Sequence, residues 1–267
     1  MKALVVIPTY NEIETLAGAL DGVRQAAPEA HILVVDDNSP DGTGRLADAR
    51  AQADDHIHVL HRNQKSGLGP AYLAGFSWAL ASGYELVCEM DADGSHRPED
   101  LALLIQRAEM ADAPDLVIGS RWVSGGATAD WDAKRVALSR GGNLYINAML
   151  GLGVRDATAG FRVYRASLLR RLNLGEVEAL GYGFQVNMTK LVADAGGRIV
   201  EMPIIFRERE AGRSKLSGGI FSEELALVTK WGLARRGAQL ADAAGSAATA
   251  VRGAADRLRR AAQKRSR

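Results

Sequence analysis

Short runs of apolar residues recur along the first half of the chain, and each is followed by a longer stretch with helical spacing. The five runs are residues 4–7, 32–35, 57–60, 86–88 and 116–119. Runs of this length, rich in Val, Ile and Leu, are typical of buried strands. Strands that alternate with helices predict an α/β fold with a doubly wound, mostly parallel sheet and flanking helices.

The helices expected between these strands begin at polar or chain-breaking positions. Asn11 and Glu12 open a helix that would place Ile13 and Leu16 on one apolar face. Further helices are expected over residues 43–53, from Pro70 to about residue 80, and over 98–111, with Pro98 at the first helical position.

The second half is less regular. Helices are expected over residues 135–150 and 182–195, and an extended stretch over 198–206. Residues 125–132 have the composition of a mobile loop, and residues 207–219 form a basic loop. The polar segment 156–162 leads into an apolar pair at residues 163 and 164.

An apolar stripe with helical spacing follows, made of Phe221, Leu225, Val228 and Trp231. This stripe either packs on the domain or rests on a membrane surface. We therefore divide the chain into a catalytic domain (1–219), an amphipathic helix (220–234) and a basic, alanine-rich tail (235–267).

Charge and cysteine content constrain where such a protein works. The tail holds nine Lys or Arg and two Asp, so the remainder of the chain is acidic overall although the net charge is +1. A basic tail suggests an anionic surface as partner. Cys88 is the one cysteine, which excludes a disulfide framework, and no apolar run approaches 18 residues. We expect a cytoplasmic protein, peripheral on the inner face of the cell membrane, with no nucleic-acid partner.

Polar residues follow the first, second and fourth predicted strands, at 9–12, 36–41 and 91–95. Ligands of doubly wound sheets collect at the carboxyl ends of the strands. Asp91 and Asp93 point to the same side of an extended chain, and two close carboxylates repel unless a cation lies between them. Hard oxygen ligands suit Mg²⁺ or Mn²⁺, with substrate phosphates completing the coordination shell.

Motifs of several other enzyme classes are missing from the sequence. A Gly-x-Gly-x-x-Gly turn does not follow the first strand, and there is no Gly-Lys-Ser/Thr phosphate loop. His56, His58 and His61 alternate along a strand as expected of a half-exposed face, whereas His96 lies beside the acidic pair.

The acidic residues at the predicted strand ends and the basic residues of the loop 207–219 together fit a metal–diphosphate substrate. Asp36 or Asp37 would accept hydrogen bonds from a base or ribose, and Arg209 and Lys215 would neutralise a departing diphosphate. This combination is that of nucleotide-sugar transfer, with the metal acting on the leaving group.

The ordered motifs resemble a known family. Pro8-Thr-Tyr-Asn-Glu12, the segments 35–43 and 90–93, Gly119-Ser-Arg121, and the segments 156–162, 181–185 and 206–215 are similar to those of GT-A family-2 glycosyltransferases. Within these, the set resembles the dolichol/polyprenol-phosphate mannose synthases, over residues 2–219.

The resemblance implies roles for individual positions. The nucleotide-sugar pocket would be lined by Pro8, Tyr10, Glu12, Val35, Asp36, Asp37 and Ala92. The metal would be held by Asp91, Asp93 and Ser95, the last replacing a frequent Gln. The catalytic residues would be Asp91, Asp93, Arg121, Arg209 and Lys215. The acceptor and its phosphate would be bound by Arg121, Arg135, Ser139, Arg162, Arg209, Ser214 and Lys215. Asn187 replaces a frequent acid, so any catalytic role of an acid at that position is lost or moved.

The resemblance also implies the reaction: mannose moves from GDP-mannose to a polyprenyl phosphate, with inversion to the β-linked product. A lipid phosphate is already anionic, so it attacks without a strong general base. Two alternatives stay open, the same fold moving glucose from UDP-glucose to a lipid phosphate, and a non-catalytic nucleotide-binding module. A membrane protein that anchors the enzyme is a further possible partner.

Overall fold

The computed structural model describes residues 1–177, 181, 183–208 and 225–237. Its strands are β1 (Ala3–Thr9), β2 (His31–Asp36), β3 (Ile57–His61), β4 (Leu86–Glu89), β5 (Leu116–Ser120), β6 (Ala127–Thr128), β7 (Arg162–Arg165), β8 (Ile199–Pro203) and β9 (Ile205–Phe206). Its helices are α1 (Leu16–Ala26), α2 (Thr43–Ala53), α3 (Leu68–Ala81), α4 (Pro98–Glu109), α5 (Ala133–Leu150), α6 (Ala166–Leu169) and α7 (Gly183–Asp194), with a 3-10 turn at Leu174–Glu176. Residues 225–237 form one more helix.

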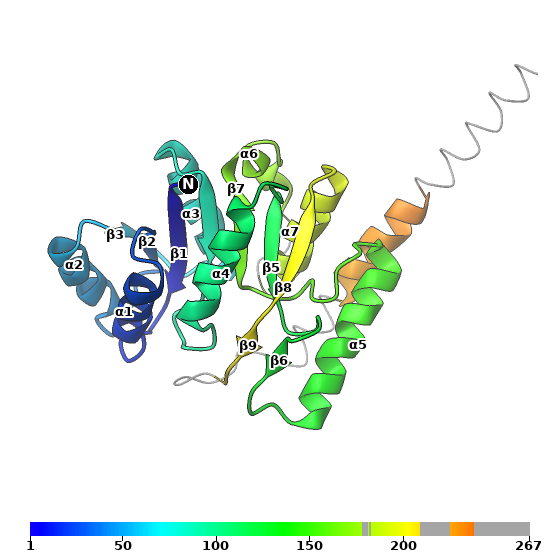
Figure 1. The fold of residues 1–267 in the computed structure, drawn as a ribbon, viewed down its shortest axis with the longest axis horizontal. Helices are drawn as coiled ribbons and strands as arrows, with labels where there is room; N and C mark the ends of the chain where they lie inside the picture. The colour runs from blue at the N-terminus through cyan, green and yellow to red at the C-terminus, as the bar shows by residue number, and fades with distance from the viewer. Residues whose placement is uncertain (178–180, 182, 209–224, 238–267) are drawn as a thin grey trace, which may run out of the picture.

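A seven-stranded sheet in the order β3-β2-β1-β4-β7-β5-β8 runs through the molecule (Figure 1). Neighbouring strands are parallel except at β7, which pairs antiparallel with both β4 and β5. All five predicted strands are present, and the mostly parallel doubly wound sheet is confirmed. The antiparallel strand β7 was not predicted beyond the apolar pair at residues 163 and 164, because it is only four residues long and begins with an arginine.

Alternation along β1 assigns its side chains to two cores. Leu4 and Val6 pack with α3 and α7, whereas Val5 and Ile7 pack with α1 and α4. On the first side, Gly75 of α3 lies so close to β1 that a Cβ atom would approach a Val6 methyl to 2.4 Å. This glycine therefore sets the distance between α3 and the sheet.

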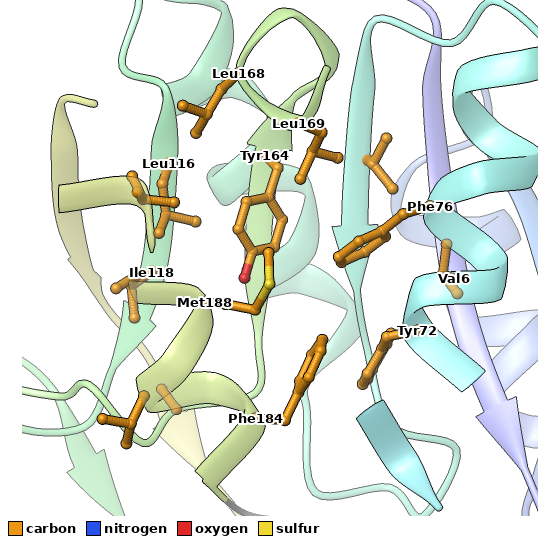
Figure 2. Close-up of a cluster of buried hydrophobic side chains, with 14 of the residues drawn as sticks. Val6, Tyr72, Phe76, Leu116, Ile118, Tyr164, Leu168, Leu169, Phe184 and Met188 are labelled. Carbon is orange, nitrogen blue, oxygen red and sulfur yellow. The ribbon is translucent and has the colours of Figure 1, made fainter. Parts of the chain in front are cut away.

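Aromatic rings fill the core on the α3 side (Figure 2). Tyr72 of α3 stacks on Phe184 of α7 with ring centroids 5.8 Å apart, and Phe76 meets Tyr164 of β7 edge-on at 5.4 Å. All four rings are completely buried. These ring contacts hold α3, α7 and β7 together on this side of the sheet.

Three local predictions are corrected: the start of the first helix, the place of Ile13 on its apolar face, and the loop over residues 125–132. Helix α1 begins at Leu16, not Asn11, because the backbone N–H groups of residues 11–13 donate to side chains of the loop after β2. Asn11 adopts a left-handed φ of 60° and Ile13 is 39% exposed. The loop expected over residues 125–132 contains β6, which pairs with β9 in a second small sheet.

The apolar stripe packs on the domain where the structure describes it. Val228 and Trp231 belong to the core on the α3 side, and Thr229 hydrogen-bonds Tyr145 of α5 at 2.5 Å. Figure 1 shows this helix lying beside α5. Phe221 lies outside the described residues, as do residues 238–267 of the tail. None of the described helices is both long and apolar enough to cross a bilayer.

Three histidines gather at the edge opposite the polar strand ends. His31 Nδ1 lies 3.0 Å from His58 Nε2, and the His31 and His56 rings are 4.6 Å apart. Burial, then the neighbouring histidines, lowers the pKa of His31, while burial followed by Lys2 and His56 lowers the pKa of His58. The folded state therefore favours the uncharged rings.

We expect the free energy of unfolding to fall as the pH drops below about 6.5, because the unfolded chain then binds protons that the folded cluster resists. His58→Phe removes one titrating ring, so its stability should depend less on pH. Urea unfolding between about pH 5 and 7.5 measures both slopes. Parallel stability curves for the two proteins would contradict this account.

Candidate active site

The carboxyl ends of β1, β2, β4 and β5 meet at one edge of the sheet, because these strands are parallel. Asp91 and Asp93 follow β4 directly. Tyr72 donates to Asp91 Oδ1 at 3.2 Å, and the Ser95 N–H donates to Asp93 Oδ1 at 3.1 Å. Gly94 turns the chain with a left-handed φ of 78°. The aspartate pair is thus held in a tight turn at the strand edge.

The residues of this turn fit a divalent cation that the substrate helps to bind. Asp91 is half-buried and Asp93 is 7% exposed, and both supply hard oxygen ligands. Ser95 Oγ is completely buried and makes no hydrogen bond in the described structure, which suits a third oxygen donor. Among the described residues, no group of three or more His, Cys, Asp or Glu is placed to hold a metal. The site therefore suits a metal whose shell is completed by phosphate oxygens.

Burial controls the ionisation of the groups around this turn. Burial, followed by the charge of Asp91, raises the pKa of Tyr72 well above its usual range, so Tyr72 stays a donor to that carboxylate. Burial also raises the pKa of Glu89 to about 8, against the opposing influence of Arg162. Burial likewise raises the pKa of the Cys88 thiol, which is inert as a nucleophile.

Arg162 lies in the core and not at an open site, contrary to its expected role in acceptor binding. Its side chain is completely buried, and its guanidinium donates to Ala159 O at 2.6 Å and Ala157 O at 2.8 Å. It also donates to Thr189 at 3.0 Å and Tyr164 at 3.2 Å. Arg162 lies opposite Glu89 in the sheet register. It is therefore a core residue, and its hydrogen bonds support the segments next to the site from within the core.

Two carboxylates lie at the carboxyl end of β2, beside the end of β1. Asp36 is 2% exposed and accepts from Thr9 at 3.1 Å and from the Ser39 hydroxyl at 2.6 Å. Asp37 is 4% exposed and accepts from Arg62 at 2.6 Å and the Ser66 N–H at 3.1 Å. Both carboxylates shape the loops around the edge, and a direct contact with a nucleoside stays a prediction.

The other residues expected in a nucleotide pocket divide by exposure. Val35 and Ala92 are almost completely buried in the core, so neither side chain lines an open site, contrary to expectation. Pro8, Tyr10 and Glu12 are half-buried at the edge. Lys65, which the sequence did not single out, places its ammonium 4.0 Å from the centre of the Tyr10 ring.

A second group of side chains lies beyond β5. Arg121 forms a buried ion pair with Asp156, donating from Nε at 2.8 Å and from Nη2 at 2.7 Å. Thr158 accepts from the same Nη2 at 2.9 Å. The guanidinium also lies 5.4 Å from the rings of both Trp122 and Trp131. Asp156 therefore fixes the orientation of Arg121.

Two further arginines from α5 stack on the same tryptophans. Arg135 lies 3.9 Å from the Trp131 ring and Arg140 lies 4.9 Å from the Trp122 ring. We call Arg121, Arg135, Arg140, Trp122 and Trp131 the arginine–tryptophan cluster. Both indole N–H groups are buried without a hydrogen-bond partner in the described structure, so the cluster offers donors as well as positive charge.

The cluster brings together predicted and unpredicted residues. Arg121 and Arg135 were expected, and Ser139 lies half-buried on α5, where its carbonyl accepts from Asn143. Arg140 and Asp156 were missed as functional residues. The available signal was a second arginine close to Arg135, in a segment that follows Trp122 and Trp131. Arg209, Ser214 and Lys215 lie outside the described residues.

Comparison with known proteins identifies the family. The model of glycosyl transferase family 2 matches residues 4–172. The chain belongs to glycosyltransferase family 2. The expectation of an enzyme is confirmed at this level, and the matched range includes the aspartate turn and all but the end of the predicted fold.

Two curated relatives are similar over nearly the whole family-2 domain. An undecaprenyl-phosphate mannosyltransferase of Micrococcus luteus is 55% identical over 236 residues, which cover 88% of this chain and 96% of the relative. A polyprenol monophosphomannose synthase of Mycolicibacterium smegmatis is 49% identical over 236 residues, which cover 88% of each chain. The resemblance to polyprenol-phosphate mannose synthases is confirmed.

Solved structures share the fold. Glucosyl-3-phosphoglycerate synthase of Mycobacterium tuberculosis, in complex with Mn²⁺, UDP-glucose and phosphoglyceric acid, superposes with a TM-score of 0.62 at 20% identity, covering 88% of this chain and 80% of that one. The mannosyltransferase PcManGT of Pyrobaculum calidifontis, in complex with GDP-Man and Mn²⁺, gives 0.54 at 19% identity, covering 95% and 79%. At these identities the likeness concerns the fold alone.

Neutralising Asp156 should destabilise this family-2 enzyme strongly. Asp156→Asn leaves the Arg121 charge buried without its counter-ion, which costs about 3 kcal/mol of unfolding free energy. Urea unfolding measures the loss. The matched control is Asp21→Asn, which breaks an ion pair with Arg50 where Asp21 is 64% exposed, and should cost less than about 1 kcal/mol. Equal losses in the two variants would contradict the assigned role of Asp156.

Proposed function

We propose that this family-2 glycosyltransferase transfers mannose from GDP-mannose to a polyprenyl phosphate, producing the β-linked mannosyl phosphate with inversion. The single observation that carries the proposal is the 55% identity to an undecaprenyl-phosphate mannosyltransferase over 96% of that protein's length. The 236 matched residues make up 88% of the chain, so the match is long enough to span both the aspartate turn and the arginine–tryptophan cluster.

The donor would bind at the ends of β1, β2 and β4. Asp91, Asp93 and Ser95 would hold Mg²⁺ or Mn²⁺ together with the diphosphate, and Tyr10 and Glu12 would face the nucleoside. When bound, the cation supplies charge neutralisation and Lewis acidity at the leaving diphosphate. Tyr72 keeps Asp91 oriented by donating to its Oδ1, and Ser95 N–H does the same for Asp93.

The acceptor phosphate would bind at the arginine–tryptophan cluster. Three guanidiniums lie together here, with Arg121 paired to Asp156 and Arg135 paired to Glu208 at 3.0 Å, and their combined donors suit a phosphate monoester. The tryptophan faces also suit the apolar isoprenoid chain next to that phosphate. Arg209, Ser214 and Lys215 remain part of the proposed phosphate site on the strength of their sequence motif.

The chemistry is a single displacement. An oxygen of the lipid phosphate forms a bond to the anomeric carbon while the bond from that carbon to the GDP diphosphate breaks, and the departing electron pair leaves with GDP. The nucleophile is already ionised at neutral pH, so the protein has to position two phosphates that repel each other and to neutralise their charge. Arg121, whose orientation Asp156 fixes, is one cation placed to do so.

The assay that tests the proposal follows radiolabelled sugar into lipid extract. We expect transfer from GDP-mannose to polyprenyl phosphate, loss of transfer with EDTA and recovery with Mn²⁺ or Mg²⁺. Turnover with UDP-glucose but not GDP-mannose would favour the alternative lipid-phosphate glucosyltransferase. Binding of GDP and metal without any product would identify a non-catalytic module.

A matched pair of variants controls that assay. Asp91→Asn should lower the rate at least about 100-fold, because it removes a charge that neutralises the cation at the leaving group. Asp21→Asn makes the same chemical change on the exposed face of α1 and should leave the rate unchanged. Wild-type turnover by Asp91→Asn would exclude the proposed metal role.

We also propose that the protein is peripheral on an anionic membrane surface, where its lipid substrate lies, either through the basic tail or through an anchoring partner. Residues 238–267 contain seven Lys or Arg and two Asp. Electrostatic attraction to anionic lipid grows by about 1 kcal/mol per basic residue near the surface. Deletion of 238–267 should therefore weaken sedimentation with anionic vesicles while activity on a short, soluble acceptor is kept; equal sedimentation would exclude the tail.

A further inference from the structure

His96 is a buried histidine that neither the metal turn nor the arginine–tryptophan cluster accounts for. It follows Ser95 and is 3% exposed. Its Nδ1 accepts the backbone N–H of Asp91 at 3.1 Å. Because Nδ1 is the acceptor, the ring nitrogen that carries the proton in the neutral form is Nε2.

The ring of His96 is clamped between two phenylalanines from separate parts of the chain. It stacks on Phe161, which precedes β7, with centroids 4.6 Å apart and planes 16° apart. It meets Phe206 of β9 edge-on at 5.5 Å. A side chain that is stacked on one ring and meets a second ring edge-on has little freedom to leave Asp91.

Phe206 in turn touches the arginine–tryptophan cluster. Its ring lies 5.6 Å from the Trp131 ring and 5.5 Å from the Arg121 guanidinium. A continuous series of contacts therefore runs from the Asp91 backbone through His96 and Phe206 to Arg121.

The backbone around His96 reinforces this series. Ser95 O accepts the Arg207 N–H at 3.1 Å, and Asp100 accepts the Ile205 N–H at 3.3 Å. The aspartate turn and the start of α4 are thus each joined by one hydrogen bond to the segment 205–207. Residues 209–215, with the predicted phosphate-binding Arg209 and Lys215, follow this segment directly in the sequence.

We propose that His96 is a positioning residue that sets the aspartate turn and the acceptor side of the site relative to each other, through its Nδ1 on Asp91 and its ring on Phe206. This inference rests on the proposed mannosyl transfer for its meaning in catalysis. The physical basis is that in-line displacement needs two anionic groups held at opposite sides of one carbon, so errors of about 1 Å cost rate.

Two substitutions separate the two contacts of His96. His96→Phe keeps an aromatic ring between Phe161 and Phe206 but leaves the Asp91 N–H without its acceptor. His96→Asn keeps an acceptor near the Nδ1 position but removes the ring. Phe206→Leu removes the opposite ring while leaving His96 intact. His56→Phe, at the far edge of the sheet, is the control for a His-to-Phe change away from the site, at a side chain that is 38% exposed.

The donor side is measured as GDP affinity in the presence of Mn²⁺ by calorimetry. We expect His96→Phe to weaken it on the order of tenfold, because an unaccepted buried N–H disfavours the turn. His96→Asn, Phe206→Leu and His56→Phe should stay within about threefold of wild type, since each keeps an acceptor on Asp91. Thermal unfolding of every variant excludes a general loss of structure.

The acceptor side is measured by hydrogen exchange of the backbone amides at residues 205–207 and by KM for polyprenyl phosphate. His96→Asn and Phe206→Leu should each raise exchange and KM, and the double variant should be no worse than either single one, because both remove the same ring contact. Wild-type GDP–Mn²⁺ affinity in His96→Phe, or additive effects of His96→Asn and Phe206→Leu, would overturn the proposal. Should His96→Phe not fold, the additivity test still decides.

These readouts separate the two proposals. GDP affinity and amide exchange require no turnover, so they report on His96 even when no sugar moves. Variants that follow the expected pattern in a protein that transfers no mannose would reject the proposed function and keep the positioning role.

Discussion

The buried guanidinium of Arg162 belongs to β7, which lies between β4 and β5 in the sheet. The paired aspartates follow β4 in the sequence, and Arg121 follows β5. β7, which Arg162 begins, is hydrogen-bonded to β4 on one side and to β5 on the other. A buried charge is tolerated only where its donors are satisfied. Arg162 meets that requirement mainly with the carbonyls of Ala157 and Ala159.

Those two carbonyls belong to the turn that orients Arg121. Asp156 and Thr158, which alternate with Ala157 and Ala159, both accept from the Arg121 guanidinium. Satisfying the buried charge of Arg162 therefore also fixes the residues that hold the cluster arginine. Glu89 lies opposite Arg162 in the sheet register, and burial raises the pKa of its carboxyl while the charge of Arg162 opposes that shift.

The sequence predicted the elements whose pattern is local. Five apolar runs gave five strands, and Asp91 and Asp93 were placed at a strand end because alternation and sheet direction are enough to do so. The start of α1 could not be predicted, because the amides of residues 11–13 are bound by side chains from a loop some thirty residues away. β6 likewise exists only through its pairing with β9.

The sequence predicted the wrong role for Arg162, Val35 and Ala92, because it does not show that these side chains are buried. An arginine in a glycine-containing polar segment looks the same whether it binds a phosphate or fills a core, and only the neighbouring carbonyls distinguish the two for Arg162. Asp156 begins one of the motifs that resemble the family, but it was assigned no role of its own, although it orients Arg121. Arg140 was missed because its contact is with Trp122, 18 residues earlier in the chain and brought close only when α5 packs.

The proposed reaction explains why the cations of the acceptor side are arginines stacked on aromatic rings. A lysine ammonium on a flexible stem would follow whichever phosphate is nearer, including that of the donor, whereas a guanidinium held by an aromatic face keeps its direction. Arg121 is also fixed by two bonds to Asp156, which lowers the net charge of the cluster without moving its remaining donors. An enzyme that brings two phosphates to one carbon needs cations that stay in place when the second anion arrives, and fixed arginines meet that need better than a larger number of mobile charges.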